Sequence, residues 1–183
     1  MNIEEKLSLY QDLLIKWGKK INLVSKSTLD DIQKRHFNDA MQLTPYIPSL
    51  DATIVDIGTG AGFPGMVLAM FGYRVSLVEI DQKKCVFLEN VANLTQTNVK
   101  VFCDRIENHT AKYDLITSRA VAPLKQLIIW SKALAHSKSI GLFLKGENYQ
   151  DEIDALSDDT YNMELIDSKT NPKAKIVKVY FEE

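Results

Sequence analysis

A glycine-rich segment at residues 53–65, TIVDIGTGAGFPG, constrains the fold of this chain more than any other stretch. Residues 53–57 favour an extended strand, and glycines follow at Gly58, Gly60 and Gly62. Because glycine has no Cβ, the backbone of such a loop can approach a nucleotide-like ligand closely. Glu79 ends the next apolar run, about 20 residues on, where such folds place a carboxylate against ribose hydroxyls. The segment therefore predicts a site for an adenosine-containing cofactor.

The identity of that cofactor depends on two residues beside the glycines. Gly60, Gly62 and Gly65 by themselves satisfy the dinucleotide pattern G-x-G-x-x-G. Asp56, however, lies two positions before the first glycine, where a carboxylate repels a pyrophosphate and attracts a cationic ligand. Pro64 removes a backbone N–H from the start of the following helix, where a phosphate needs donors. We therefore expect an acidic crevice that binds S-adenosylmethionine, while NAD remains the alternative if Asp56 only caps the loop.

Composition and charge set the broad class of the protein. The 183 residues are 45% hydrophobic and 25% charged, which predicts one globular domain with a possible appendage. The net charge is −2 and the pI is near 6.0, so binding of nucleic acid requires a local basic patch. The candidates for that patch are Lys16, Lys19, Lys20, Lys26, Lys34, Arg35 and Lys145.

Cysteine usage and hydropathy predict the compartment. Cys85 and Cys103 lack the spacing of metal ligands, and two cysteines permit at most one disulfide. The chain has no apolar run of about 18 residues and no secretory signal at its acidic first residues. We expect a cytoplasmic monomer that binds no metal and no membrane.

The first fifty residues predict a helical extension. Asn2 and Glu5 form a capping-box pattern ahead of a helix that ends near Gly18. The apolar stripe of this helix consists of Ile3, Leu7, Tyr10, Leu14 and Trp17. A second helix is expected over residues 29–43, capped by Thr28 and ended by prolines. We place a boundary within residues 45–51, which gives an extension at 1–50 and a main domain at 51–183.

Strands and helices alternate from residue 51 onward. We expect strands at residues 53–57, 74–79, 98–103, 113–117, 139–145, 161–166 and 175–181, and helices at 64–71, 82–95, 123–136 and 148–156. This alternation predicts an α/β fold with a mostly parallel sheet. The last two strands are separated by a short loop with a turn at Asn171–Pro172, so they are expected to form a hairpin.

Several separated motifs resemble one family. They are WGKKINLVS (17–25), RHFNDA (35–40), DIGTGAGFPG (56–65), DRIE (104–107), SRAVA (118–122) and LKG (144–146). In order and content they resemble the small-subunit (16S) ribosomal RNA guanine-N7 methyltransferase family, RsmG, also called glucose-inhibited division protein B. This resemblance implies a Rossmann-like class I S-adenosylmethionine-dependent methyltransferase fold with seven strands and an N-terminal helical extension.

The resemblance also implies roles for individual residues. The loop from Gly58 through Gly60 to Phe63 matches the part of the family that contacts S-adenosylmethionine, and Glu79 matches the position that holds the ribose. Ile106 and Glu107 match the adenine edge, and Arg119 matches the arginine of the SRA segment, where cofactor and substrate meet.

The chemistry of the implied reaction is consistent with the sequence. Guanine N7 carries a lone pair and no proton, so its methylation requires positioning and exclusion of water but no general base. Methylation of a pyrimidine C5 would need a nucleophilic cysteine, and we interpret both cysteines as structural. Amino-group methyltransferases carry an N/D-P-P-Y/F motif after the fourth strand, where this chain has SRAV.

Several roles stay open at this level. Arg119 can bind guanine O6 or a phosphate, or it can form an ion pair with Glu79 or Glu107. His36 and Asp39 share one helical face, and we favour a structural link between the extension and the main domain over catalysis. Two other functions remain: a small-molecule methyltransferase on the same fold, and a nucleotide-binding module without catalysis.

Overall fold

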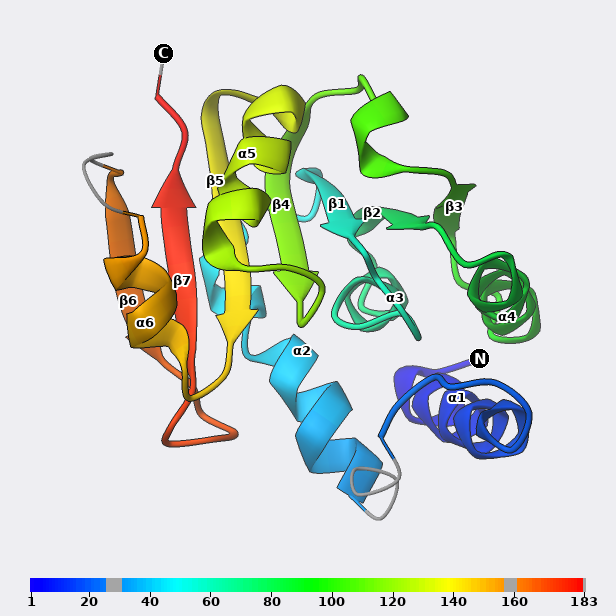
Figure 1. Cartoon of the computed structure of the whole chain (residues 1–183). Coiled ribbons are helices and arrows are strands. Elements are labelled where there is room, and N and C mark those ends of the chain that lie inside the picture. The colour runs from blue at the N-terminus through cyan, green and yellow to red at the C-terminus, as the bar shows by residue number, and fades with distance from the viewer. Residues whose placement is uncertain (26–30, 157–160, 183) are drawn as a thin grey trace.

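A twisted sheet of seven strands forms the centre of the computed structural model, which describes residues 1–25, 31–156 and 161–182 (Figure 1). The strands are β1 (Thr53–Ile57), β2 (Arg74–Glu79), β3 (Val99–Cys103), β4 (Tyr113–Arg119), β5 (Ala135–Lys145), β6 (Met163–Asp167) and β7 (Lys175–Tyr180). Their order is β3-β2-β1-β4-β5-β7-β6. The first five strands are parallel, and β7 runs antiparallel to both of its neighbours. The predicted α/β sheet and its terminal hairpin are confirmed.

Helices cover both faces of the sheet: α3 (Gly65–Met70), α4 (Gln82–Leu94), α5 (Leu124–Leu134) and α6 (Tyr149–Asp154). Successive strand residues point to opposite faces. Ile54 of β1 therefore joins a core with α3 and α4, whereas Val55 joins a second core with α5 and α6. Oδ1 of Asp81 accepts hydrogen bonds from the N–H groups of Lys83 and Lys84 in the first turn of α4, which explains where that helix begins.

One predicted boundary is wrong between α5 and β5. The sequence predicted a helix to residue 136 and a strand from 139, but α5 ends at Leu134 and β5 begins at Ala135. Ala135 pairs with Tyr113 of β4. Ser139 reinforces this pairing because its Oγ donates to the Tyr113 carbonyl at 2.6 Å. Long-range strand pairing thus ends the helix two residues early.

The N-terminal extension begins with α1 (Ile3–Gly18). The predicted capping box is confirmed, since Asn2 Oδ1 accepts from the Glu5 N–H and Glu5 Oε2 accepts from the Asn2 N–H, both at 2.9 Å. Figure 1 shows α1 beside α3 and α4. Tyr10 is fully buried and belongs to the same core as Ile54. The extension therefore completes the core on one face of the sheet; the boundary at 45–51 stays a prediction.

The second predicted helix differs from expectation. A π-helical turn, η2 (Gln33–Asn38), is followed by a short α2 (Asp39–Met41) and a 3₁₀ turn, η3 (Thr44–Tyr46). The expected cap at Thr28 and start at Leu29 lie outside the described residues. The helix ends at Met41 rather than near Leu43, and the Met41 carbonyl accepts from Thr44 Oγ1 at 2.9 Å where η3 begins.

Within the described residues, the structure contains no helix with the length and hydropathy that spanning a membrane would require.

Candidate active site

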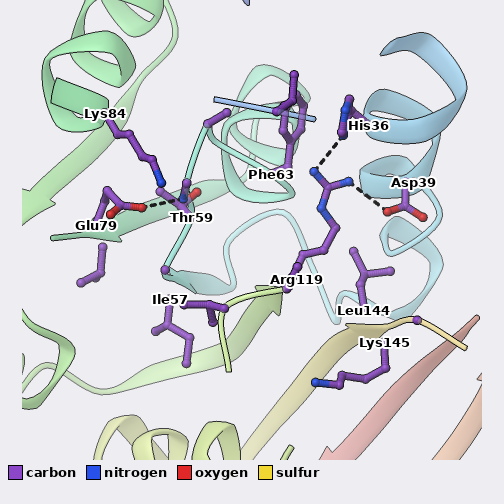
Figure 2. Close-up of a pocket in the computed structure, with 18 of the residues that line it drawn as sticks. His36, Asp39, Ile57, Thr59, Phe63, Glu79, Lys84, Arg119, Leu144 and Lys145 are labelled. Carbon is purple, nitrogen blue, oxygen red and sulfur yellow. Dashed lines mark hydrogen bonds and ion pairs between the residues drawn. The ribbon is translucent and has the colours of Figure 1, made fainter. Parts of the chain in front are cut away.

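A cavity of about 830 Å³ opens at the carboxyl ends of the parallel strands (Figure 2). Such a position is the usual ligand site of an open α/β sheet. Residues at or just after the ends of the five parallel strands line the cavity, together with residues of the extension and of the loop between β6 and β7: residues 57–61 and Phe63, 78–80, 104–107, 119–121, 144–146, 23–25, Arg35, His36, Asp39, Ser168, Thr170, Asn171, Ala174 and Lys175. The ends of all five parallel strands are thus brought together, and the N-terminal extension adds a wall.

The glycine loop lies against the segment that follows β4. Gly58 and Gly60 both have a left-handed backbone, with φ of 62° and 61°. A Cβ on Gly58 would lie 2.2 Å from Cγ2 of Val121. Ala120 itself has a φ of 57°, which turns the chain so that Val121 covers the loop. Glycine is required at Gly58 by its backbone conformation and by this close contact.

Asp56 does not line the cavity, so the expectation of an acidic crevice built on this residue is wrong. Its carboxylate is fully buried and accepts from Thr59 Oγ1 at 2.5 Å, Gly65 N at 2.9 Å and Thr117 Oγ1 at 3.1 Å. Burial raises the pKa of Asp56 to about 6, although the hydrogen bonds of Thr59, Gly65 and Thr117 oppose that shift. Asp56 therefore caps the loop and fixes its shape.

Several backbone N–H groups of the loop donate hydrogen bonds to acceptors within the protein. The N–H groups of Gly62 and Phe63 donate to the Thr59 carbonyl, and Gly65 N donates to Asp56. Gly60 N donates to Glu79 Oε2 at 2.8 Å. A pyrophosphate needs free N–H groups at such a loop. This pattern disfavours a dinucleotide more directly than the charge of Asp56 does.

Glu79 stands at the end of β2 and lines the cavity. Its Oε1 accepts from the N–H groups of Ile80 and Asp81, both at 2.9 Å, and its Oε2 accepts from Gly60. Three backbone donors thus hold the carboxylate in one orientation, and it is 6% exposed. These contacts use three of the roughly four acceptor sites of the carboxylate, so one site on Oε2 remains for a ribose hydroxyl.

Ile106 and Glu107 lie on η4 (Ile106–Asn108) at the far end of the cavity. Glu107 Oε1 accepts from Trp130 Nε1 at 3.1 Å, which joins η4 to α5. The exposed apolar side chain of Ile80, next to Glu79, also lines the cavity. The arrangement provides apolar surface with polar groups at its edge, which suits a purine base.

Arg119, at the end of β4, is held by three acceptors from the N-terminal extension (Figure 2). Its Nη1 donates to the Arg35 carbonyl and to Asp39 Oδ2, both at 3.1 Å, and its Nη2 donates to His36 Nδ1 at 2.9 Å. The expected alternative of an ion pair with Glu79 or Glu107 is wrong, because the ion pair is formed with Asp39. Two donors of the guanidinium remain beyond these three contacts.

His36 is neutral in this arrangement. A guanidinium can only donate, so Nδ1 of His36 must be the acceptor and the ring proton is on Nε2. Burial, followed by the positive charges of Arg119 and Arg35, lowers the pKa of His36 to about 4. His36 and Asp39 each link the extension to the main domain through Arg119, in agreement with the structural role favoured above.

Phe63 connects the glycine loop to the extension. Its ring stacks on His36 with centroids 4.8 Å apart and on Tyr10 at 5.3 Å. The guanidinium carbon of Arg119 lies 5.0 Å from the ring centroid. Phe63 is 3% exposed, so its ring forms only a small part of the cavity wall. The side chain is chiefly an anchor that sets the position of Arg119.

Lys145 and the two cysteines are accounted for by local contacts. Lys145 Nζ donates to Glu152 Oε2 at 2.6 Å and to the Ala122 carbonyl at 3.0 Å, so its charge is already neutralised.

Cys85 is buried and its Sγ lies 3.4 Å from the Glu79 carbonyl. Burial raises the pKa of the Cys85 thiol to about 12, which is far from a reactive thiolate. Both cysteines are free thiols.

Sequence reasoning missed one wall of the cavity, which comes from the loop between β6 and β7. Ser168, Thr170 and Asn171 line the cavity from that loop. The loop was predicted only as a turn, because isolated Ser, Thr and Asn residues form no motif there.

The strand order, the glycine loop after β1 and the carboxylate after β2 define a class I S-adenosylmethionine-dependent methyltransferase fold. Two solved structures share it. The magnesium protoporphyrin IX methyltransferase of Synechocystis PCC 6803 with bound SAM superposes with a TM-score of 0.69 at 15% identity, covering 96% of each chain. The ribosomal protein L11 methylase of Lactobacillus delbrueckii has a TM-score of 0.66 at 16% identity, covering 79% of this chain and 77% of that one.

Sequence comparison defines the family. The model of the GidB family, described as rRNA small subunit methyltransferase G, matches residues 3–177. The ribosomal RNA small subunit methyltransferase G of Gluconobacter oxydans is 40% identical over 178 residues, which is 96% of this chain and 92% of that protein. The protein of the same name from Paramagnetospirillum magneticum is 47% identical over 155 residues, which is 82% of this chain and 75% of that protein. The chain belongs to the rRNA small subunit methyltransferase G family, as its motifs predicted.

Proposed function

We propose that this protein transfers the methyl group of S-adenosylmethionine to N7 of a guanine in 16S ribosomal RNA. The observation that carries the proposal is one continuous cavity, in a chain of this family, that joins the glycine loop and Glu79 to Arg119 and the N-terminal extension. S-adenosylmethionine held against the glycine loop and Glu79 would face an acceptor held beside Arg119 and the extension.

The donor would be held by residues at the ends of β1, β2 and β3. Glu79 accepts from a ribose hydroxyl, and Ile106 and Glu107 frame the adenine. Gly58 and Gly60 adopt left-handed backbone conformations, so that the loop backbone reaches the ligand without Cβ atoms in the way. Bound S-adenosylmethionine supplies the electrophilic methyl group. The internally bonded N–H groups of the loop support this cofactor over NAD.

The protein's own part in the reaction is positioning. Guanine N7 attacks with a lone pair, so no side chain has to remove a proton. The two remaining donors of Arg119 can bind guanine O6 or a phosphate of the acceptor. Contact of Arg119 with N7 itself would oppose the reaction, because N7 becomes cationic on methylation. Cavity walls of Phe63, Leu144 and Val121 exclude water from the methyl group.

Exposed positive charges near the site favour a nucleic acid over a metabolite as the substrate. Lys16, Lys19, Lys20, Lys34 and Arg35 are exposed on the extension that borders the cavity, whereas Lys26 lies outside the described residues. We include the exposed cations in a phosphate-binding patch beside the site. A small-molecule methyltransferase has no use for such a patch.

Transfer of labelled methyl groups tests the proposal. The protein is incubated with radiolabelled S-adenosylmethionine and either naked 16S RNA or 30S particles that lack the modification. We expect label in the RNA, and calorimetry should detect binding of S-adenosylmethionine but not of NAD. Binding of S-adenosylmethionine without label in either RNA substrate would favour the non-catalytic module. Label in a small metabolite alone would favour the small-molecule enzyme.

A further inference from the structure

The cavity continues past Arg119 to a second end that the donor residues do not reach. Its lining consists of Arg35, Asp39, Leu144, Ser168, Thr170, Asn171, Ala174 and Lys175. We propose that this end is the acceptor subsite, in which Arg35 binds a phosphate and Asn171 binds the base edge of the guanosine nucleotide. Asp39 is the positioning residue that fixes this wall relative to Arg119. The inference rests on the function proposed above.

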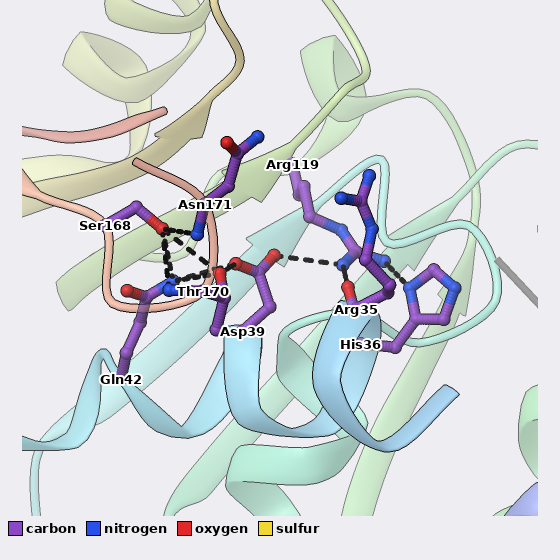
Figure 3. Close-up of polar contacts among 8 residues, drawn as sticks. All are labelled: Arg35, His36, Asp39, Gln42, Arg119, Ser168, Thr170 and Asn171. Atoms are coloured by element: carbon purple, nitrogen blue, oxygen red, sulfur yellow. Dashed lines mark hydrogen bonds and ion pairs between the residues drawn. The ribbon is translucent and has the colours of Figure 1, made fainter. Parts of the chain in front are cut away.

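Asp39 bridges the two walls with its two carboxylate oxygens (Figure 3). Oδ2 accepts from Arg119 Nη1 at 3.1 Å, while Oδ1 accepts from Thr170 Oγ1 at 2.6 Å. Gln42 Nε2 also donates to Oδ1, at 2.8 Å. The side chains of Asp39 and Arg119 are 17% and 18% exposed, so solvent screens their attraction only in part. One carboxylate therefore connects the end of β4 with the loop between β6 and β7.

The loop between β6 and β7 is held in one conformation by the extension. Gln42 Oε1 accepts from the backbone N–H of Lys169 at 2.8 Å, and Gln42 is 6% exposed. Ser168 Oγ accepts from the N–H groups of Thr170 and Asn171, both at 3.3 Å. A loop fixed by buried side chains can present a polar group to a ligand with little entropic cost.

Asn171 offers an amide donor to the cavity. Its Oδ1 accepts from the Lys173 N–H at 3.0 Å, which orients the side chain and leaves the NH₂ group on the other side. Figure 3 shows this amide pointing away from Ser168, Thr170 and Gln42. An N–H donor complements guanine O6, an acceptor next to N7. Hydrogen bonding at O6 leaves the N7 lone pair free to attack.

Arg35 offers a charge beside the same cavity. Its carbonyl accepts from Arg119, which fixes its backbone, while its side chain is exposed. Among the described residues, the ion pairs do not include the Arg35 guanidinium, whereas Lys145 and Lys175 are both paired with carboxylates. An exposed guanidinium of this kind fits the two oxygens of a phosphate. An acceptor nucleotide within a nucleic-acid strand supplies both a base and a phosphate.

Arg35→Ala and Asn171→Ala test the two contacts. We expect each variant to raise the KM for 16S RNA, and the dissociation constant of a fluorescent RNA fragment carrying the target guanine, by about tenfold. The affinity for S-adenosylmethionine, measured by calorimetry, should change by less than about twofold. Matched controls are Lys173→Ala, in the same loop but outside the cavity lining, and Arg74→Ala, an exposed arginine at the amino end of β2.

Asp39→Asn tests the positioning role, since it keeps the size of the side chain but removes its charge. We expect a rise in the RNA KM of about tenfold, with affinity for S-adenosylmethionine nearly unchanged. Thr170→Val removes the hydroxyl group that donates to Asp39 Oδ1, which is the other contact made by this carboxylate. The double variant should be less impaired than the product of the two single effects, because both changes cut the same connection.

The inference and the proposed function fail in different ways. If the wild type methylates RNA but Arg35→Ala and Asn171→Ala match the controls in RNA KM and RNA binding, the acceptor subsite is overturned and the function stands. If the wild type transfers no methyl group to RNA, the function fails. If Asp39→Asn lowers affinity for S-adenosylmethionine as much as for RNA, its assigned role is overturned.

Discussion

Arg119 Nη1 and Asp39 Oδ2 lie 3.1 Å apart, and this contact joins the end of β4 to a helix 80 residues earlier in the chain. The guanidinium lies over the ring of Phe63 and also donates to His36. The extension therefore does more than complete a core: it sets the direction in which Arg119 faces the cavity.

Removal of Arg119 should affect activity and stability together. Arg119→Ala removes the donor to Asp39 Oδ2 and the donor to His36 Nδ1, at a cost of about 2 kcal/mol in the free energy of unfolding. We expect methyl transfer to fall by at least about tenfold, since the acceptor loses its orienting contact. Arg119→Lys should recover only part of both losses, because an ammonium cannot reach three acceptors in one plane. Full turnover by Arg119→Ala would contradict the role given to this residue.

Phe63→Leu should separate anchoring from direct cofactor contact. The change keeps an apolar side chain but removes the stacking on His36 and Tyr10, and we expect it to lower the free energy of unfolding by about 1–2 kcal/mol. Because the ring supports Arg119, turnover should fall more than affinity for S-adenosylmethionine. Phe71→Leu, at a partly buried position at the end of α3, is the control for the loss of an aromatic ring. Chemical denaturation measures the free energy of unfolding, calorimetry measures the affinity for S-adenosylmethionine, and the methyl-transfer assay measures turnover. A loss of affinity that exceeds the loss of turnover would contradict the anchor role of Phe63.

Glu79→Gln should weaken cofactor binding. A glutamine amide nitrogen would face one of the N–H groups that now donate to Glu79, and it would remove an acceptor for the ribose. We expect affinity for S-adenosylmethionine to fall by about tenfold in calorimetry. Glu89→Gln, on the exposed side of α4, is the matched control. Equal affinities for these two variants would count against the ribose role.

His36 should make the extension sensitive to acid. The pKa of histidine is about 6.5 in an unfolded chain, and burial together with Arg119 and Arg35 lowers the pKa of His36 to about 4 in the folded protein. Between these values the unfolded chain binds a proton that the folded protein does not. The contribution of His36 to the free energy of unfolding is therefore complete above pH 6.5 and is lost as the pH falls toward 4.

A variant isolates this contribution from the rest of the protein. The pKa of Asp56 is raised to about 6, so Asp56 gives a slope of opposite sign over much of the same range. The difference in unfolding free energy between the wild type and His36→Gln should shrink by on the order of 2 kcal/mol from pH 7 to pH 4. Urea denaturation across this range measures it, and a difference independent of pH would contradict the neutral, buried His36.

The sequence predicted the elements of this fold well where local pattern decides them. The bounds of β1 and β2 agree with prediction because each is an apolar run ended by glycine or charged residues. The early start of β5 was not predictable, since it depends on pairing of Ala135 with Tyr113. The glycine loop and Glu79 were placed at the cavity because the ends of parallel strands share one edge of the sheet.

The partners within the site were less predictable, because they depend on how distant segments dock. Asp56 was read as a cavity residue, but Thr117, 61 positions later, helps to enclose it. An ion pair of Arg119 with Glu79 or Glu107 was the alternative to a ligand role, and only the docking of the extension makes the ion-pair partner Asp39. Thr170 takes part through a hydrogen bond across 131 positions, for which a single sequence contains no local signal.

Mass spectrometry of nucleosides tests the central claim most directly. Unmodified 16S RNA or 30S particles are treated with the protein and S-adenosylmethionine, and the RNA is digested to nucleosides. We predict one new product, 7-methylguanosine, which is absent when the protein is omitted. A methyl group in any other nucleoside, or no methylated product from either substrate, would contradict the claim.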